Sequence, residues 1–143
     1  MIKPLDANEV FDVLDARKGY LISNYGRCYS LKTNKFLKPN INSNGYQRYD
    51  IRYVENGIDI FRKQVFAHLE VVKHFGDCNG NTIENLSKFI DIMQIDHRDR
   101  NKLNNRCSNL QITSAKVNQR RKYVKLEDID LIYDDIFWGS IWT

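Results

Sequence analysis

The feature that most constrains the fold is the dipeptide Asn56-Gly57, which lies between two stretches of alternating polar and apolar residues. A two-residue type I′ turn needs positive φ at both central positions, and Asn followed by Gly meets that need. Before the turn, Tyr49, Ile51 and Tyr53 alternate with charged residues, which places them on one face of a strand. The sequence therefore predicts a β-hairpin over residues 41–63.

The residues around this hairpin predict further short strands and one helix. Residues 19–40 combine aromatic and aliphatic side chains with turn-forming Asn and Gly, and a second turn signal lies at Asn44-Gly45. The amphipathic pattern of residues 1–18 fits either a short helix or a strand. Residues 64–75 carry apolar side chains near helical spacing, and Gly76 is a plausible stop, so we expect a helix there.

A second hairpin is predicted over residues 90–113. An isoleucine-rich run leads into Asp96-His97, a polar loop follows, and a return strand completes the unit. Ser114 is a good N-cap for a helix over residues 115–123, which would carry Asn118 about one turn in. The sequence thus predicts a strand–loop–strand–helix unit with polar groups at its centre.

Asp96, His97 and Asn118 are the groups that hydrolysis of a phosphodiester would use. Imidazole, with an ordinary pKa of about 6.5, accepts a proton near neutral pH. A hard cation such as Mg²⁺ prefers oxygen ligands, which Asp96 and Asn118 can supply. Neighbouring strand residues point to opposite faces, so Asp96 and His97 share a site only where the strand ends. An isolated Asp-His pair would most often be structural; its combination with the Asn-rich basic loop indicates a metal-dependent nuclease.

The charge distribution points to a polyanionic partner. Residues 126–143 contain five acids and no Lys or Arg, so the preceding 125 residues hold 22 basic and 13 acidic side chains, a balance of +9. Nucleic acid is the simplest such partner. No apolar run is long enough to cross a bilayer, and the three cysteines have no paired spacing. We therefore expect a cytoplasmic protein without a membrane partner, in the host cytoplasm for a phage-encoded chain.

Together these motifs resemble the ββα-metal site of the HNH endonucleases, and more narrowly the homing endonucleases of phages and introns. The matching elements are Asp96-His97, Asn104-Asn105-Arg106, Ser108-Asn109-Leu110, Thr113 and Asn118. The resemblance implies that His97 is the general base, and that Asp96 and Asn118 hold Mg²⁺, Mn²⁺ or another divalent cation. It also implies that Asn109 ties the loop together and orients the histidine. Asn118 stands where many members have His, which argues against zinc.

A second resemblance lies upstream. Residues 19–51 and the following helix look like the β-rich DNA-binding module that precedes this nuclease motif in the family, with Ile22–Arg27 as its hallmark. The expected fold class is α+β: a hairpin-rich DNA-binding module with one helix, then the ββα-metal nuclease motif, then a docking tail. The expected boundaries are 1–75 for the module, 76–89 for the connection, 90–123 for the HNH motif and 124–143 for the acidic, aromatic tail.

Eight basic residues are expected to contact double-stranded DNA: Arg27, Lys32, Lys35, Arg98, Arg106, Arg120, Arg121 and Lys122. The alternative for them is an ordinary solvated strand face or, for the last three, a helix end that favours positive charge. Two other functions stay open. The chain could be a non-catalytic DNA-binding or regulatory protein, or it could be an interaction protein whose acidic tail binds a partner or covers the basic cleft. A monomer would nick DNA, whereas a symmetric homodimer could cut both strands.

Overall fold

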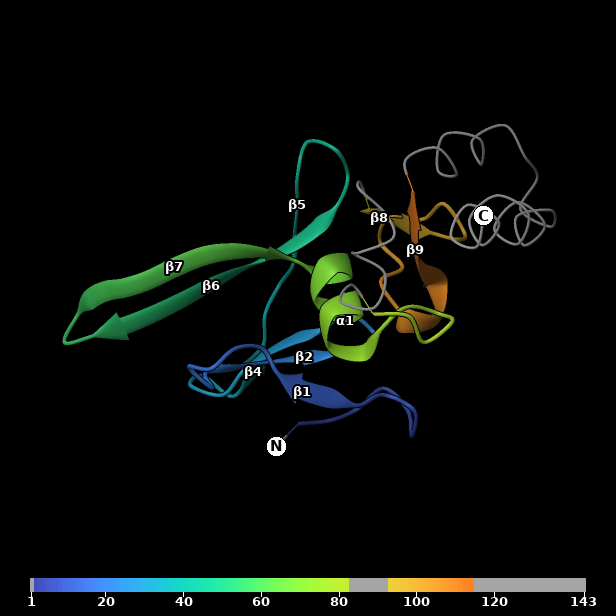
Figure 1. The fold of residues 1–143 in the computed structure, drawn as a ribbon. Coiled ribbons are helices and arrows are strands. Elements are labelled where there is room, and N and C mark those ends of the chain that lie inside the picture. The colour runs from blue at the N-terminus through green and yellow to red at the C-terminus, as the bar shows by residue number, and fades with distance from the viewer. Residues whose placement is uncertain (1, 83–92, 115–143) are drawn as a thin grey trace.

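The computed structural model describes residues 2–82 and 93–114, and this part of the chain is mostly β with one helix (Figure 1). The first four strands are β1 (Phe11–Val13), β2 (Tyr20–Ser23), β3 (Cys28–Ser30) and β4 (Lys35–Phe36). The next elements are β5 (Asn40–Ile41), β6 (Gln47–Glu55), β7 (Ile58–Phe66) and α1 (Ala67–Phe75). The last are β8 (Met93–His97), the single 3-10 turn η1 (Cys107–Asn109) and β9 (Leu110–Ser114).

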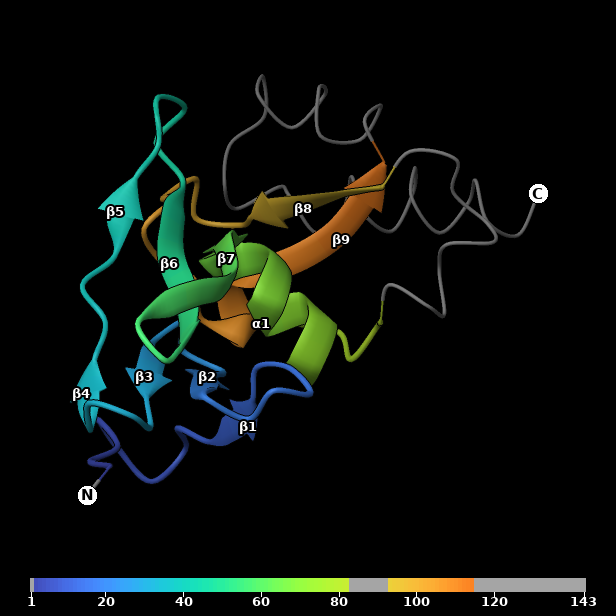
Figure 2. The same cartoon turned by 90° about the vertical axis from the view of Figure 1, so that its left-hand side faces the viewer.

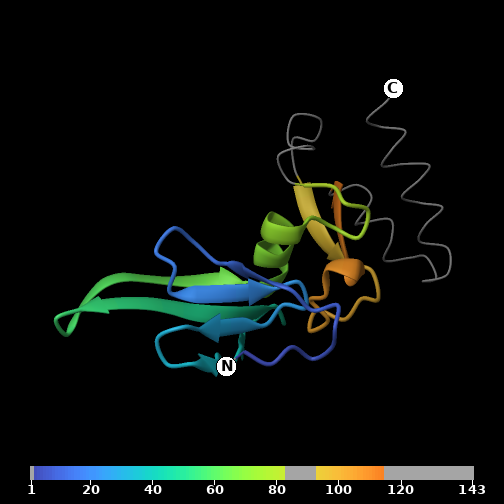
Figure 3. The same ribbon diagram turned by 90° about the horizontal axis from the view of Figure 1, so that it is seen from below.

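The described strands form three antiparallel sheets, in the orders β1-β2-β3-β4, β5-β6-β7 and β8-β9. Helix α1 lies between the four-stranded sheet and the β8–β9 hairpin (Figures 1 and 2). The β6–β7 hairpin extends as a long arm beyond this body (Figures 1 and 3). At its tip, Ile58 is 68% exposed. The arrangement sets β8–β9 against the helix rather than against the arm.

The β6–β7 hairpin confirms the turn predicted from Asn56-Gly57. The two residues have φ values of 53° and 78°, as a type I′ turn requires. The second arm is longer than expected, because β7 continues to Phe66 and the helix starts at Ala67 rather than at residue 64. Val65 pairs with Tyr49 and is buried, so sheet pairing and burial decide the conformation of residues whose spacing also suits a helix.

One core joins the N-terminal sheet, the base of the arm and the helix. Its buried members are Leu14, Ile22, Cys28, Tyr49, Ile51, Val65 and Ala67. Full burial of an aliphatic side chain of this size contributes about 1.5–3 kcal/mol, so this shared core fixes α1 on the sheet. Residues 11–13 are a strand, which resolves the choice left open by their pattern. The helix ends at Gly76, whose φ is 79° and whose N–H donates to the Val72 carbonyl, as predicted.

The β8–β9 hairpin confirms the second predicted hairpin. Asp77, which lies just beyond the helix, connects this hairpin to the rest of the fold. Oδ2 of its buried carboxylate accepts the backbone N–H of Ile112 in β9 at 3.0 Å. The predicted helix over 115–123 and the predicted docking tail lie outside the described residues. Within the described residues, no helix has the length and apolar character needed to cross a bilayer.

Candidate active site

Asp96 and His97 lie at the end of β8, where the sequence predicted that the strand must end. His97 is the last residue of β8 and pairs with Leu110, the first residue of β9. The chain then turns, with the Arg100 N–H donating to the His97 carbonyl at 2.9 Å. Both side chains are buried, at 7% exposure for Asp96 and 4% for His97. The last two residues of β8 are therefore a buried carboxylate and a buried imidazole.

Asn105 sets the orientation of the His97 ring. Nε2 of His97 lies 2.7 Å from Oδ1 of Asn105, whose side chain is 2% exposed. An amide oxygen only accepts hydrogen bonds, so Nε2 carries the proton and donates it. In the neutral ring, Nδ1 is then the basic nitrogen. The Asn105 amide is itself fixed, because its Nδ2 donates to Oε1 of Gln47 in β6 at 3.0 Å.

Asn109, which was expected to tie the loop together and to orient the histidine, makes side-chain hydrogen bonds within the loop. Its Oδ1 accepts the Asp99 N–H at 3.0 Å, and its Nδ2 donates to Oδ1 of Asp99 and to the Asn104 carbonyl. The contact with imidazole belongs to Asn105. The sequence analysis quoted Asn105 within a motif but gave it no role. Its position eight residues beyond His97 in an irregular loop carries no periodic signal that could have revealed the contact.

Asp99 is a second residue whose role was not foreseen. One carboxylate oxygen accepts from Nδ2 of Asn109 at 2.9 Å, and the other accepts from Nδ2 of Asn104 at 2.8 Å. Burial alone would raise the pKa of Asp99, but these hydrogen bonds hold it below its ordinary value. An ionised Asp99 thus fastens the loop that carries Asn105.

His68, in the first turn of α1, packs against His97 from the helix side. The ring centroids of the two histidines are 5.4 Å apart, and the His68 ring stacks on Tyr46 at 4.9 Å with a 28° interplanar angle. The side chain of His68 is buried. Burial, followed by the charge of His97, lowers the pKa of His68 to about 4. His68 therefore stays neutral at physiological pH.

A groove of about 440 Å³ opens beside these rings. Its lining combines amide and aromatic side chains, from Asn42, Asn44, Tyr46, Phe66, His68, Leu69, Gln94 and Ile95. Lys102 stands at the groove: its ammonium donates to the Asn44 carbonyl at 2.7 Å and lies 4.7 Å from the Tyr46 ring centroid. Positive charge and polar groups thus gather next to His97.

The turn that follows β2 supports the active-site loop. A Cβ added to Gly26, whose φ is 86°, would lie 2.7 Å from the Cβ of Asn105, so only glycine fits there. The Gly26 carbonyl accepts the Tyr49 hydroxyl at 2.6 Å, and the Asn24 carbonyl accepts the Cys107 N–H at 2.8 Å. The N-terminal sheet and the loop after β8 are therefore packed into one unit.

Arg27, one of the expected DNA-binding residues, has an internal partner. Its guanidinium forms two hydrogen bonds with the buried carboxylate of Glu9, donates to the Lys3 carbonyl at 2.9 Å and lies 3.9 Å from the Phe36 ring centroid. Nε and Nη2 of Arg27 are therefore engaged within the fold. No local pattern around Arg27 could reveal the position of Glu9.

The other expected DNA contacts are differently placed. Lys32 and Lys35 are exposed around the β3–β4 turn, and the Arg106 guanidinium lies over the Tyr25 ring at 4.0 Å. Arg98 is half-buried, with Nη1 3.8 Å from Sγ of Cys78. Four further candidates lie outside the described residues, namely Asn118, Arg120, Arg121 and Lys122.

A divalent metal would find oxygen donors at this strand end. Asp96 provides a buried carboxylate next to His97 in the sequence, and a carboxylate oxygen is a donor that suits a hard cation which keeps several of its own waters. Within residues 2–82 and 93–114, no three His, Cys, Asp or Glu side chains gather as a candidate metal site. Of the two expected metal ligands, Asp96 lies in the described part of the chain and Asn118 lies outside it.

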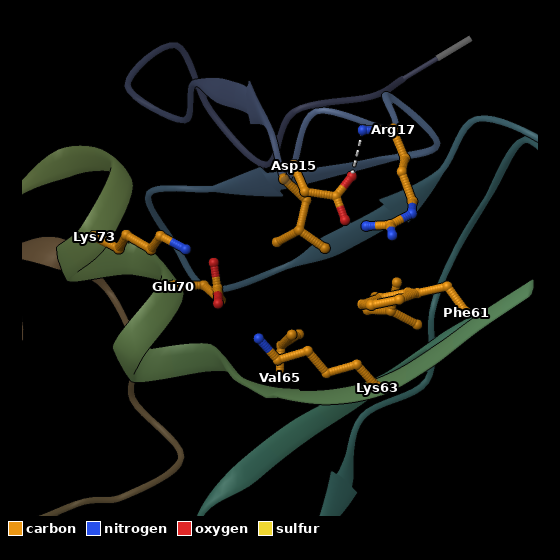
Figure 4. Close-up of a pocket in the computed structure, with 9 residues that line it drawn as sticks. Asp15, Arg17, Phe61, Lys63, Val65, Glu70 and Lys73 are labelled. Atoms are coloured by element: carbon orange, nitrogen blue, oxygen red, sulfur yellow. Dashed lines mark hydrogen bonds between the residues drawn. The ribbon is translucent and has the colours of Figure 1, made fainter. Parts of the chain in front are cut away.

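A second, smaller cavity of about 150 Å³ lies between the β6–β7 arm, the β1–β2 connection and α1 (Figure 4). Arg17 covers the Phe61 ring at 3.9 Å, and Glu70, Lys63 and Lys73 complete a rim of mixed charge. None of the lining residues belongs to β8 or β9. We therefore place the candidate active site at His97 and not in this cavity.

Comparison with known proteins agrees with this geometry. Residues 66–120 match the family described as HNH endonuclease, and residues 12–52 match the NUMOD4 motif. Residues 66–120 therefore belong to the HNH endonuclease family, and a NUMOD4 motif precedes them. The first match includes α1 as well as β8 and β9, in keeping with the contact between His68 and His97.

Individual relatives are endonucleases of phages. The H-N-H endonuclease F-TflII of Escherichia phage T5 is 33% identical over 102 residues, which cover 71% of this chain and 46% of that protein. The DNA endonuclease I-HmuI of Bacillus phage SP01 is 33% identical over 99 residues, which cover 69% of this chain and 48% of that protein. The chain thus spans about half the length of these relatives. The solved structure of the HNH homing endonuclease I-HmuI is similar with a TM-score of 0.60 and 28% identity, covering 87% of this chain and 66% of that chain.

Proposed function

We propose that this protein is a metal-dependent DNA endonuclease of the homing type, with His97 as general base. The observation that carries the proposal is the hydrogen bond from Nε2 of His97 to Oδ1 of Asn105 at 2.7 Å. It leaves Nδ1 as the basic nitrogen of a buried imidazole next to Asp96. The membership in the HNH endonuclease family and the likeness to I-HmuI supply the reaction class.

In the proposed reaction, Nδ1 of His97 takes a proton from a water molecule as its oxygen attacks the phosphorus. The P–O3′ bond breaks, and the leaving oxygen takes a proton from solvent, so the products carry 5′-phosphate and 3′-hydroxyl ends. A divalent cation, held by Asp96 and Asn118, would supply the positive charge that stabilises the phosphate and the leaving oxygen. Asn105 holds the His97 ring in the orientation that presents Nδ1.

The proposed partner is double-stranded DNA. Lys32, Lys35 and Arg106 are exposed and are proposed as phosphate contacts, together with the half-buried Arg27 and Arg98. Arg120, Arg121 and Lys122 stay in the proposal as neighbours of Asn118 in sequence. We further propose that residues 1–75 serve mainly to bind DNA, that 76–89 connect and that 90–123 form the nuclease motif. A symmetric homodimer would cut both strands and a monomer would nick.

A plasmid-cleavage assay tests this function. Purified wild type and His97→Ala are incubated with supercoiled DNA in Mg²⁺, in Mn²⁺ and in EDTA, beside the control Leu5→Ala, which alters an exposed residue at the N-terminus. We expect wild type and the control to nick or linearise the DNA with either metal and not with EDTA. His97→Ala should not cleave, although it should bind the same DNA with similar affinity. Ligation of the products without phosphatase or kinase treatment checks their ends.

Two outcomes would contradict the proposal. Cleavage by His97→Ala at the wild-type rate would remove the assigned base. Tight, salt-dependent DNA binding without cleavage, on a random-sequence library as well as on plasmid, would indicate the non-catalytic DNA-binding function instead. The library matters because an enzyme of the homing type requires its own target sequence.

A further inference from the structure

The His97 ring touches two aromatic rings that the proposed chemistry does not use. The His68 centroid lies 5.4 Å from it at a 52° angle, and the Tyr46 centroid lies 6.0 Å away at 35°. His68 and Tyr46 stack on each other, so the three rings form one cluster. His97 is therefore held at its Nε2 edge by Asn105 and against its ring by this pair.

The chemistry of His68 is unusual for a purely packing residue. Its Nδ1 is buried and has no hydrogen-bond partner among residues 2–82 and 93–114. A buried polar atom without a partner is destabilising and uncommon in native proteins. A phenylalanine ring would fill this space without that cost. Because burial lowers its pKa to about 4, His68 adds no second positive charge when His97 takes a proton.

We infer that His68 is a positioning residue for DNA cleavage: with Tyr46, its neutral ring holds the plane of the His97 imidazole. The inference rests on the proposed function. Asn105 fixes one atom of the imidazole, whereas the His68–Tyr46 pair lies against the ring and so bears on its plane. The stacked pair also offers π faces to the imidazolium that forms during the reaction. Helix α1 thereby contributes to the active site through its second residue.

The inference predicts a change in the chemical step with no change in DNA affinity. Single-turnover cleavage with excess protein gives the rate, and DNA binding in Ca²⁺ gives the affinity. His68→Ala removes the ring and should slow cleavage by a factor on the order of ten or more, because misalignment of a catalytic group has effects of this size. Its Kd for DNA should stay within about twofold of wild type, since His68 is buried.

Matched variants separate the ring from other causes. His68→Phe keeps the ring and loses the unpartnered nitrogen, so it should fold at least as stably as wild type and cleave at a similar rate. Leu5→Ala alters an apolar residue that is 61% exposed and lies outside the groove, and it should leave the rate unchanged. Should His68→Ala fail to fold, His68→Leu takes its place, because leucine fills most of the volume without a planar ring.

A spectroscopic readout tests the same point without cleavage. Long-range ¹H–¹⁵N correlation spectra distinguish the two neutral tautomers of a histidine. Wild type should show His97 with the proton on Nε2 alone, whereas His68→Ala should show nitrogen shifts averaged between the tautomers. This arm remains informative if wild type does not cleave, which would overturn the proposed function and not the positioning of His97.

Two results would overturn the inference. The first is folded His68→Ala that cleaves as fast as wild type and keeps the single His97 tautomer. The second is His68→Phe that is as slow as His68→Ala, because a ring nitrogen and not the ring would then be required. Slow cleavage by His68→Ala, near-normal cleavage by His68→Phe and unchanged DNA affinity would together establish the positioning role.

Discussion

Replacement of Asn105 by alanine is the perturbation that the active-site geometry predicts most directly. Two hydrogen bonds disappear, from Nε2 of His97 at 2.7 Å and to Oε1 of Gln47 at 3.0 Å. His97 is 4% exposed, so water does not readily replace the lost acceptor, and an unsatisfied buried group costs about 1–3 kcal/mol. Gln47 is half-buried and water can replace its lost partner, so the loss of this second hydrogen bond costs about 1 kcal/mol. We therefore expect the free energy of unfolding to fall by about 2–4 kcal/mol.

The effect on cleavage should exceed that of a purely structural change. Without the Asn105 acceptor, neither the tautomer nor the edge of the His97 ring is selected, and misalignment of this kind slows a reaction by up to about a hundredfold. Asn105→Asp is the matched control, because its carboxylate still accepts the Nε2–H. It should keep the Nε2 tautomer and cleave within about tenfold of wild type.

The assays are urea unfolding and single-turnover cleavage under conditions where each variant is folded. The reasoning would be refuted by Asn105→Ala that is destabilised but cleaves as fast as wild type, since the hydrogen bond would then hold only the fold. It would also be refuted if Asn105→Asp lost the Nε2 tautomer, because accepting that proton is the role assigned to the side chain.

Three further predictions concern stability, each measured by urea unfolding. Gly26→Ala should lower the free energy of unfolding by about 2–4 kcal/mol, because the new Cβ lies 2.7 Å from the Cβ of Asn105 and the backbone has a left-handed φ. An unchanged urea midpoint would contradict the packing described. Glu9→Gln should lower the free energy of unfolding by about 3 kcal/mol, because Arg27 loses its charged partner. A change within experimental error would show that the ion pair is dispensable. Between pH 6.5 and 4 the unfolded chain protonates His68 and the folded chain does not, so wild type should lose up to about 3 kcal/mol as pH falls. His68→Phe should lack this share of the acid destabilisation, and an identical pH profile for both proteins would show that burial does not lower the pKa of His68.

Local sequence determined the elements whose signals are local. Asn56-Gly57 adopts positive φ because few residue pairs do so at low cost, and the turn then imposes the hairpin. Gly76 ends the helix for the same reason. The Asp96-His97 pair lies at a strand end because a polar loop follows an apolar strand, and the motif order gave the family. Boundaries were less accurate, since the spacing near Val65 suits a helix as well as a strand.

Tertiary structure decided which side chains contact the His97 imidazole or the residues that hold it. Asn105, His68 and Gln47 come from a loop, a helix and a distant strand, and no local pattern relates them to His97. The same holds for the contact between Arg27 and Glu9, which lie 18 residues apart in the sequence. The physical reason is that hydrogen bonds and ring contacts act over a few ångströms in space, whatever the separation in sequence. Residue type and spacing therefore determined the chemistry that is available, and packing decided which groups carry it out.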